Sequence, residues 1–228
     1  FITDNLNYQQ TVQASNKTIE SAFGYSGQKC SACSIVYIPS SIYDKFMILL
    51  EESRQRFMNR DSFKNYGLIN ENSYEKTSSI IKTIKSDSKY KLISGGTLKE
   101  NPQFYLEPTI IECSDHDDFI FNKEFFAPIL AVYKYDNLQD TMDLCKNSNN
   151  YALTGSVFSN KTEFLEYSTE FFSEKCGNFY INDKSTGSIV GNQPFGGSGR
   201  SGTNDKAGDI NFLYRLFNQQ TVKSNLLF

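Results

Sequence analysis

Residues 34–58 read SIVYIPSSIYDKFMILLEESRQRFM, and this stretch contains the local pattern that decides the fold class. Residues 34–38 alternate in the manner of a β-strand, which Pro39 then ends. Ser40 is the expected cap of a helix that continues to about Met58. The apolar face of this helix carries Ile42, Phe46, Leu49 and Leu50. A strand followed directly by an amphipathic helix is typical of α/β proteins.

Strands and helices keep alternating on both sides of this unit. Further helices are predicted at residues 11–23, 74–85, 138–146 and 160–172. Further strands are predicted at residues 90–93, 104–112, 129–135, 152–158, 178–182 and 212–222. This order predicts an α/β fold with a mainly parallel sheet flanked by helices.

The composition is that of an ordinary globular chain, and it excludes several classes of function. The 228 residues carry a formal net charge of -3, and 21% of them are charged. No Lys/Arg-rich run marks a nucleic-acid-binding surface, and the longest apolar stretches, such as 125–132, are too short to cross a membrane. The odd number of cysteines, five, favours free thiols in a reducing compartment. No signal or transit peptide is readable in residues 1–8.

Cys30 is the candidate nucleophile because of the loop that contains it. Residues 27–31 read GQKCS, which places the Lys29 ammonium beside the thiol, and a helical turn is predicted at 31–33. A nearby ammonium and the amides of a helix N-terminus both favour the thiolate. A buried structural cysteine is the alternative that the local context leaves open.

Two other stretches stand out from the rest of the chain. Residues 123–128 read KEFFAP, and residues 194–197 read PFGG, followed by SG at 201–202. The second stretch lies within residues 186–208, which contain seven of the fourteen glycines. Such a density indicates backbone in unusual conformations or in close approach to a ligand.

Three ordered motifs resemble those of the aldehyde dehydrogenase family. FGYSGQKC at 23–30 is similar to the active-site signature, an aromatic residue followed by Gly-Gln-x-Cys. KEFFAP at 123–128 is similar to the Glu-x-Phe-Gly-Pro segment, with Ala127 in place of glycine, and PFGG at 194–197 is similar to the C-terminal loop. Within the family, three strings resemble the Δ1-pyrroline-5-carboxylate dehydrogenase branch: GQKCSACS at 27–34, NFYINDKSTGSIVG at 178–191 and SGTNDK at 201–206.

The resemblance implies an NAD-dependent oxidation with Cys30 as the nucleophile. Its thiolate would attack the aldehyde to form a thiohemiacetal, hydride transfer would leave a thioester, and water would release the acid. The backbone amide of Cys30 is the expected oxyanion donor. The resemblance further implies that Glu124 binds a ribose of the cofactor and that Phe126 packs near the nicotinamide. Without it, Glu124 would be interpreted as a surface carboxylate and Phe126 as a core aromatic.

The implied substrate is L-glutamate γ-semialdehyde, which forms from Δ1-pyrroline-5-carboxylate and is oxidised to glutamate in proline catabolism. By resemblance, Ser31, Gly187 and Ser188 hold its far carboxylate, and Phe195 packs on its aliphatic stem. Hydroxyls and backbone amides can bind a carboxylate with directed hydrogen bonds. Without the resemblance, a capped turn at Ser31 and a flexible loop at 187–188 explain the same residues equally well.

A metal site is the competing interpretation of the cysteines. Cys30 and Cys33 have the spacing of a redox or metal pair, and Cys113 with His116 could complete a zinc site. The two pairs are far apart in sequence, and zinc would quench the nucleophile, so we predict no metal. Cys33 is then a packed neighbour, with a Cys30–Cys33 disulfide as the remaining alternative. His116, the only histidine, lies in an acidic stretch, which argues against a Cys-His hydrolase.

The resemblance covers nearly the whole chain but only about the last two-fifths of a typical family member. We expect residues 1–208 to form the catalytic domain and residues 209–228 an oligomerisation segment. The cofactor domain, the oxyanion asparagine and the general-base glutamate would precede residue 1. The chain is then either part of an active dehydrogenase or a non-catalytic structural or assembly subunit that keeps the fold. Intact Cys30, Glu124 and Phe195 favour the first hypothesis.

The implied partners are a small aldehyde, NAD and further copies of the chain. An unpaired apolar edge strand at 212–222 would be a liability in a monomer, which favours a homo-oligomer. A separate chain that supplies the cofactor domain is the alternative. By resemblance, a eukaryotic member would lie in the mitochondrial matrix and a bacterial one in the cytoplasm.

Overall fold

The computed structural model describes residues 1–60, 67–100, 104–148 and 150–226. The helices within them are α1 (Tyr8–Phe23), α2 (Tyr43–Met58), α3 (Glu71–Ser86), α4 (Phe119–Asn122), α5 (Leu138–Asn147), α6 (Thr162–Phe171), α7 (Ile210–Tyr214) and the 3₁₀ turns η1 (Gly24–Gly27) and η2 (Ser40–Ile42). The strands are β1 (Ile35–Pro39), β2 (Lys91–Ser94), β3 (Leu98–Lys99), β4 (Tyr105–Leu106), β5 (Thr109–Glu112), β6 (Ile129–Tyr135), β7 (Tyr151–Ala152), β8 (Thr154–Val157), β9 (Asn178–Ile181) and β10 (Ser198–Gly199). None of the helices in these described ranges is both long and apolar enough to cross a membrane.

A four-stranded sheet with the order β1-β6-β5-β2 forms the centre of the larger part of the molecule. β1 and β5 both pair in parallel with β6, and Ala131 of β6 lies between Ile35 and Ile111. β2 pairs antiparallel with β5 and forms an edge of the sheet. The predicted α/β fold with a mainly parallel sheet is confirmed, and β2 makes the sheet mixed.

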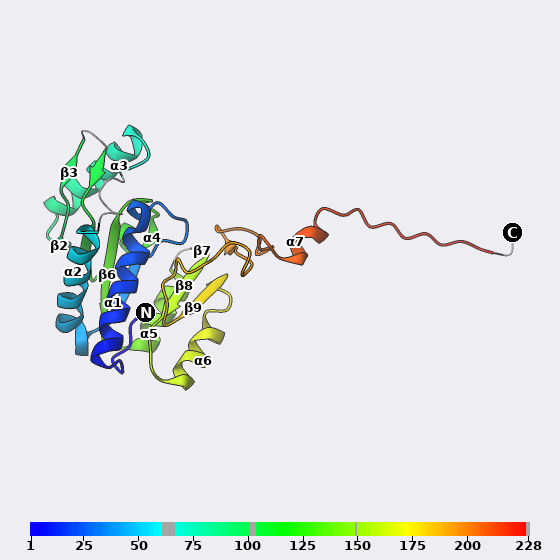
Figure 1. Cartoon of the computed structure of the whole chain (residues 1–228), viewed down its shortest axis with the longest axis horizontal. Coiled ribbons are helices and arrows are strands. Elements are labelled where there is room, and N and C mark those ends of the chain that lie inside the picture. The colour runs from blue at the N-terminus through cyan, green and yellow to red at the C-terminus, as the bar shows by residue number, and fades with distance from the viewer. Residues whose placement is uncertain (61–66, 101–103, 149, 227–228) are drawn as a thin grey trace.

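Successive residues of the central strand β6 are buried on opposite faces of this sheet, as the period of a strand requires. Leu130 and Val132 belong to one core, which α1 and α2 cover, whereas Ile129 and Ala131 belong to a second core, to which α3 and α4 contribute. Figure 1 shows α1 and α2 beside the sheet and α3 at its upper end. Burial on both faces explains why β6 is almost continuously apolar.

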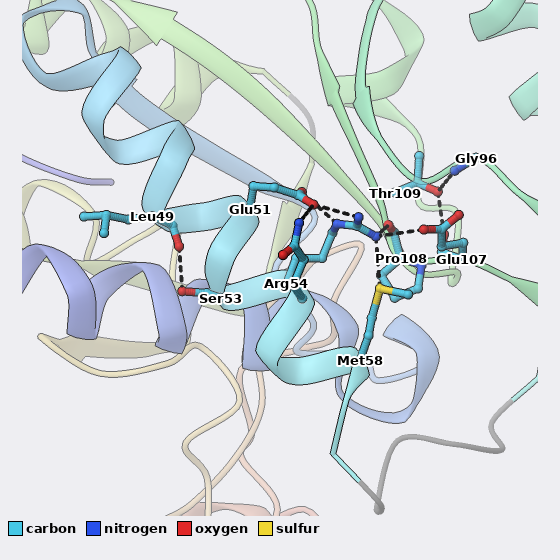
Figure 2. A network of polar contacts seen from close by, with 10 residues as sticks. Leu49, Glu51, Ser53, Arg54, Met58, Gly96, Glu107, Pro108 and Thr109 are labelled. Atoms are coloured by element: carbon cyan, nitrogen blue, oxygen red, sulfur yellow. Dashed lines mark hydrogen bonds and ion pairs between the residues drawn. The ribbon is translucent and has the colours of Figure 1, made fainter.

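Arg54 joins α2 to the loop between β4 and β5 (Figure 2). Its side chain is 8% exposed and forms ion pairs with Glu51 at 2.8 Å and with Glu107 at 3.1 Å. The same guanidinium donates to the carbonyl oxygen of Pro108 at 3.2 Å. A planar group with several donors is suited to joining three acceptors from two elements.

A smaller group of strands lies beside the main sheet (Figure 1). β8 pairs in parallel with β9, and β7 pairs antiparallel with β10. Residues 1–3 connect the two groups, because the Ile2 amide donates to Tyr37 O at 3.0 Å while Ile2 also pairs in parallel with Phe158. The Phe1 ring stacks on Tyr37 with ring centroids 4.3 Å apart.

Two predicted strands are each divided in the structure. The strand predicted at 104–112 is interrupted between β4 and β5 at Glu107 and Pro108, where proline has no amide hydrogen for a ladder. The strand predicted at 152–158 becomes β7 and β8, on either side of Leu153. These halves pair with different strands, β10 and β9, so the division follows from tertiary contacts.

The described residues contain no strand at 212–222, so this prediction is wrong for the single chain. Asp209 caps the short helix α7 by accepting a hydrogen bond from the Asn211 amide. Residues 215–226 then run away from the body of the molecule without strand structure (Figure 1). A strand requires a neighbour for its backbone groups, and no described part of the chain supplies one here. The predicted role in oligomerisation stays a prediction.

Candidate active site

Cys30 follows a stretch of left-handed backbone that directly continues α1. In η1, Tyr25, Ser26 and Gly27 have φ values of 58°, 56° and 67°. This region is uncommon for residues other than glycine, so the first two residues carry backbone strain. Cys30 itself lies in a tight turn in which the Ala32 amide donates to Lys29 O at 3.0 Å. The helical turn predicted at 31–33 is therefore wrong, and so is the predicted contribution of helix amides to the thiolate.

Gly27 brings the turn that contains Cys30 against the KEFFAP segment. A Cβ atom built at Gly27 would lie 2.3 Å from the carbonyl oxygen of Ala127 and 2.7 Å from its carbonyl carbon. Backbone atoms at this distance cannot rotate away as a side chain could, so the contact requires glycine. Two motifs that are distant in the sequence thus touch directly.

A cavity of about 420 Å³ extends over these two motifs. Its lining includes Cys30, Glu124 and Phe126, so the structure brings together the residues predicted for the nucleophile and for cofactor binding. The volume is in the range of ordinary ligand sites. The residues predicted for substrate binding are not among those that line it, namely Ser31, Gly187, Ser188 and Phe195.

These four residues make other contacts within the chain. Ser31 is buried, with 9% exposed, and the Gly187 amide donates to Lys184 O at 3.0 Å. The Ser188 hydroxyl lies 2.6 Å from that of Tyr180. Phe195 forms an antiparallel bridge with Ala207.

Ser185 ties the 178–191 segment to the turn that contains Cys30. Its hydroxyl donates to Ser31 O at 2.9 Å and lies 3.2 Å from the Ser21 hydroxyl, so it contacts both the turn and α1. Lys17 of α1 also pairs with Asp183 at 2.5 Å. Ser185 was not among the predicted site residues, although it lies inside the matched string at 178–191. Its position in that string was the one available signal.

Two further residues, Asn178 and Lys206, bind the backbone at the glycine-rich segment 186–208. Neither was among the predicted site residues. The Asn178 amide donates to Pro194 O at 2.9 Å and accepts from the Gly196 amide at 3.2 Å. Lys206 donates to the carbonyl oxygens of Gly177 at 2.6 Å and Gly196 at 2.9 Å. These bonds satisfy backbone groups of a loop that has little regular structure of its own.

The five cysteines, all within the described residues, differ sharply in their surroundings. Cys30 is exposed, whereas the other four are partly or fully buried. Burial raises the pKa of the Cys33 thiol to about 11 and that of Cys176 to about 12. Burial also raises the pKa values of Cys113 and Cys145. Thiols with raised pKa values stay protonated near neutral pH, so these four are poor nucleophiles.

The side chains of Glu124 and Phe126 are both exposed to solvent. Glu124 is exposed, and its carboxylate has no hydrogen-bonding or ionic partner among the residues that the structure describes. Phe126 is 46% exposed and has a φ of 53°, which is an outlier for a bulky residue. Strained backbone of this kind is concentrated at functional sites.

The zinc site that we considered as the competing interpretation has no geometric support in the described part of the chain. No group of three or more histidine, cysteine, aspartate or glutamate residues there could hold a metal ion. His116 instead lies 3.0 Å from the Tyr37 hydroxyl and stacks on Phe121. Burial lowers the pKa of His116 below its ordinary value.

Most of the chain matches one known protein family. The model of the "Aldehyde dehydrogenase family" matches residues 2–222. The chain belongs to the aldehyde dehydrogenase family. It is 38% identical over 213 residues to "Delta-1-pyrroline-5-carboxylate dehydrogenase, mitochondrial" of Mus musculus, which covers 90% of this chain and 38% of the relative. It is also 38% identical over 218 residues to the protein of the same name from Dictyostelium discoideum, covering 93% and 39%.

A solved structure shows the same arrangement as this aldehyde dehydrogenase chain. The 1-pyrroline-5-carboxylate dehydrogenase from Thermus with bound NAD superposes with a TM-score of 0.83 at 29% identity. The superposition covers 93% of this chain and 40% of that one. The chain thus spans about two-fifths of the length of the relatives that it matches.

Proposed function

We propose that the protein containing this chain oxidises L-glutamate γ-semialdehyde, formed from Δ1-pyrroline-5-carboxylate, to glutamate with NAD as cofactor. In this proposal residues 1–208 are the catalytic domain and 209–228 an oligomerisation segment. The names of the relatives support the substrate class. The observation that carries the proposal is the exposed Cys30 thiol in one cavity with Glu124 and Phe126.

Cys30 is the nucleophile in this reaction. Its thiolate adds to the aldehyde carbon, which forms a C–S bond and turns the carbonyl oxygen into an oxyanion. The Cys30 amide has no acceptor among the described residues and can therefore donate to that oxyanion. Oxidation of this thiohemiacetal gives a thioester, and water then cleaves the C–S bond to release the acid and the thiol.

The residues at the cavity fit the proposed cofactor. The Glu124 carboxylate, which lacks a partner among the described residues, can accept a hydrogen bond from a ribose hydroxyl. The exposed Phe126 ring offers an apolar surface for the nicotinamide. When bound, NAD supplies the acceptor for the hydride that leaves the substrate carbon.

The charges around the cavity support an anionic substrate. One acidic residue, Glu124, lines it, together with these cationic residues: Lys17, Lys29, Lys123, Lys175, Lys184 and Arg200. A cleft lined by charges of one sign concentrates ligands of the opposite sign. We assign the far carboxylate to Ser31, Gly187 and Ser188, which lie outside this lining, so the assignment rests on the resemblance and not on the cavity. The hydrogen bond from Ser185 to Ser31 O supports this assignment, because it joins the two segments that contain them.

The aliphatic stem of the substrate is assigned to Phe195. An aromatic ring buries the methylene groups between the aldehyde and the carboxylate with little loss of side-chain entropy. The bonds that Asn178 makes to Pro194 O and to the Gly196 amide fix the backbone on both sides of Phe195, which supports a defined position for its ring.

NADH formation by the protein that contains this chain tests the proposal. With glutamate semialdehyde, we expect Cys30→Ser to lower turnover to less than about 1% of the parent, because a hydroxyl has no thiolate-like state at neutral pH. Cys33→Ser is the matched control and should keep most of the turnover, since the pKa of Cys33 is already raised to about 11. An aliphatic aldehyde of similar length without the carboxylate should react roughly 100-fold less efficiently.

The contrary outcomes separate the parts of the proposal. A parent protein with no turnover would instead support a non-catalytic structural or assembly subunit. Equal losses in Cys30→Ser and Cys33→Ser would point to a redox pair. Equal oxidation of both aldehydes would contradict the semialdehyde assignment and leave aldehyde oxidation itself standing.

The proposed assembly is a homo-oligomer, or a complex with a chain that supplies the cofactor domain. Exposed apolar side chains beyond α7 support the first, among them Leu216, Phe217 and Val222. The relatives from Mus musculus and Dictyostelium discoideum are named mitochondrial. We therefore propose the mitochondrial matrix for a eukaryotic source and the cytoplasm for a bacterial one.

A further inference from the structure

Gln28, two positions before Cys30, uses both ends of its side-chain amide to hold a distant segment. Its Nε2 donates to Gly67 O at 3.0 Å and to Tyr25 O at 3.3 Å. Its Oε1 accepts from the Ile69 amide at 2.8 Å. One half-buried side chain therefore links the turn that contains Cys30 to the backbone on both sides of Leu68.

The segment that Gln28 holds is itself fixed to the body of the protein. Leu68 is 5% exposed and belongs to the second core, below the sheet face that carries Ile129 and Ala131. The Leu68 amide donates to Phe104 O at 3.1 Å. Gln28 is thus joined to an anchored backbone, which gives its hydrogen bonds a fixed direction.

The turn needs an anchor at this point. Tyr25 and Ser26 hold strained left-handed backbone immediately before Gln28, and such strain persists only where surrounding contacts maintain it. After Cys30, the hydrogen bond from Ser185 to Ser31 O fixes the other side. Cys30 itself is exposed, and its thiol has no partner among the described residues. Contacts of its neighbours therefore define its place.

We propose that Gln28 is a positioning residue that sets the location of the Cys30 sulfur in the cavity through its bonds to Gly67 and Ile69. The inference rests on the proposed function for its catalytic consequence. Attack on a carbonyl requires the reacting atoms to be held about 3–3.5 Å apart, and a displacement of about 1 Å can lower the rate roughly 100-fold. Gln28 acts on this distance without contacting the substrate.

Amide hydrogen exchange of the protein with Gln28→Met tests the positioning itself. Methionine has a similar length and volume but cannot make the three hydrogen bonds. The Ile69 amide loses its acceptor and should exchange faster as a direct effect. The decisive amide is that of Ala32, whose own acceptor, Lys29 O, is unchanged. We expect it to exchange at least about tenfold faster, because the turn around Cys30 opens more often.

Turnover of the same variant tests the consequence. We expect kcat per folded molecule to fall roughly 10- to 100-fold, with the KM for the aldehyde within about twofold of the parent. Gln55→Met is the matched control, because Gln55 is exposed on α2 and donates to Glu51 of the same helix. It should change neither Ala32 exchange nor kcat. If Gln28→Met does not fold, Gln28→Asn replaces it, because the asparagine side chain is one methylene too short to reach Gly67 and Ile69.

Amide exchange and turnover of Gln28→Met can each contradict the inference separately. Faster exchange at Ile69 with unchanged exchange at Ala32 would overturn the inference, since the link would then be broken without moving the turn. Unchanged kcat would also overturn it. A parent without turnover would contradict the proposed function alone, and exchange at Ala32 would still decide whether Gln28 positions the turn.

Discussion

Gly27 and Ala127 are in contact through backbone atoms, and this contact can be tested with one added methyl group. We expect Gly27→Ala to lower the free energy of unfolding by about 3 kcal/mol, from the φ of 67° and from an atom placed 2.3 Å from Ala127 O. Gly191→Ala is the matched control, because Gly191 has a φ of 86° and nothing within 4 Å of the added Cβ. Gly191→Ala should lower the free energy of unfolding by only about 1 kcal/mol. Urea unfolding of the two variants measures both losses. Equal losses would mean that the Ala127 contact is relieved by movement of the loop.

His116 makes stability depend on pH in a direction that burial determines. Burial lowers its pKa in the folded protein, so the unfolded chain, with a pKa near 6.5, binds more protons at mildly acidic pH. The contribution of this group is therefore complete above about pH 6.5 and decreases as the pH falls toward the folded pKa. We expect His116→Phe to lose less stability than the parent between about pH 7.5 and pH 5.5 in urea unfolding.

His116 is the only histidine in the sequence, so no other histidine contributes to the difference between the parent and His116→Phe. The variant also loses the contact with the Tyr37 hydroxyl, so its stability at the higher pH is expected to be lower. The quantity to compare is the change between the two pH values. An identical change in parent and variant would exclude His116 as its source.

At the residue scale, the motifs in the sequence identified Cys30, Glu124 and Phe126, which line one cavity in the structure. Local spacing could not identify Gln28, Ser185 or Lys206 as supports. Their partners are backbone carbonyls and amides, which any sequence supplies, so only the folded path of the chain reveals them.

Arg54 tests how α2 is joined to the edge of the sheet. We expect Arg54→Met to lower the free energy of unfolding by about 3 kcal/mol, because Glu51 and Glu107 would lose the cation between them (Figure 2). Arg56→Met is the matched control on the same helix, since Arg56 is 50% exposed and its pair with Glu52 is 3.6 Å long. It should change stability by less than about 0.5 kcal/mol. Similar losses in thermal or urea unfolding would show that the buried bonds of Arg54 contribute little.

Among the elements, those with a strong local pattern were predicted most closely. The strand at 129–135 agrees with β6 at both ends, because every residue in it is apolar or aromatic except Lys134. The strand at 152–158 was divided, because its two halves pair with β10 and β9 and no local pattern encodes that choice. The segment at 212–222 has strand-like composition, but none of the described residues pairs with it.

For the whole molecule, residues 215–226 form an arm whose removal should separate folding from assembly. Its side chains are exposed, with Leu216 at 69% and Val222 at 78%. We expect deletion of residues 215–228 to leave the urea midpoint of the subunit nearly unchanged, since little buried surface is lost. Sedimentation should then show smaller assemblies than the parent, if copies associate through this arm as proposed.

The same assembly can be tested without shortening the chain. Phe217→Asp places a charge in the arm at a side chain that is 65% exposed, and it should shift association in the same direction. A lowered urea midpoint together with an unchanged sedimentation coefficient would contradict the proposed role of residues 209–228.

The place of residues 1–3 between β1 and β8 also has a consequence for the time course of synthesis. Ile2 needs Phe158 as a partner, yet a ribosome that adds about 5–20 residues per second makes Phe158 roughly 8–30 s after Ile2. During that interval residues 1–3 can contact β1 but not β8. Nascent chains that end before Phe158 should therefore remain open to proteases at residues 1–3. Full protection of these residues should arise only after β8 and Phe158 have emerged from the ribosome.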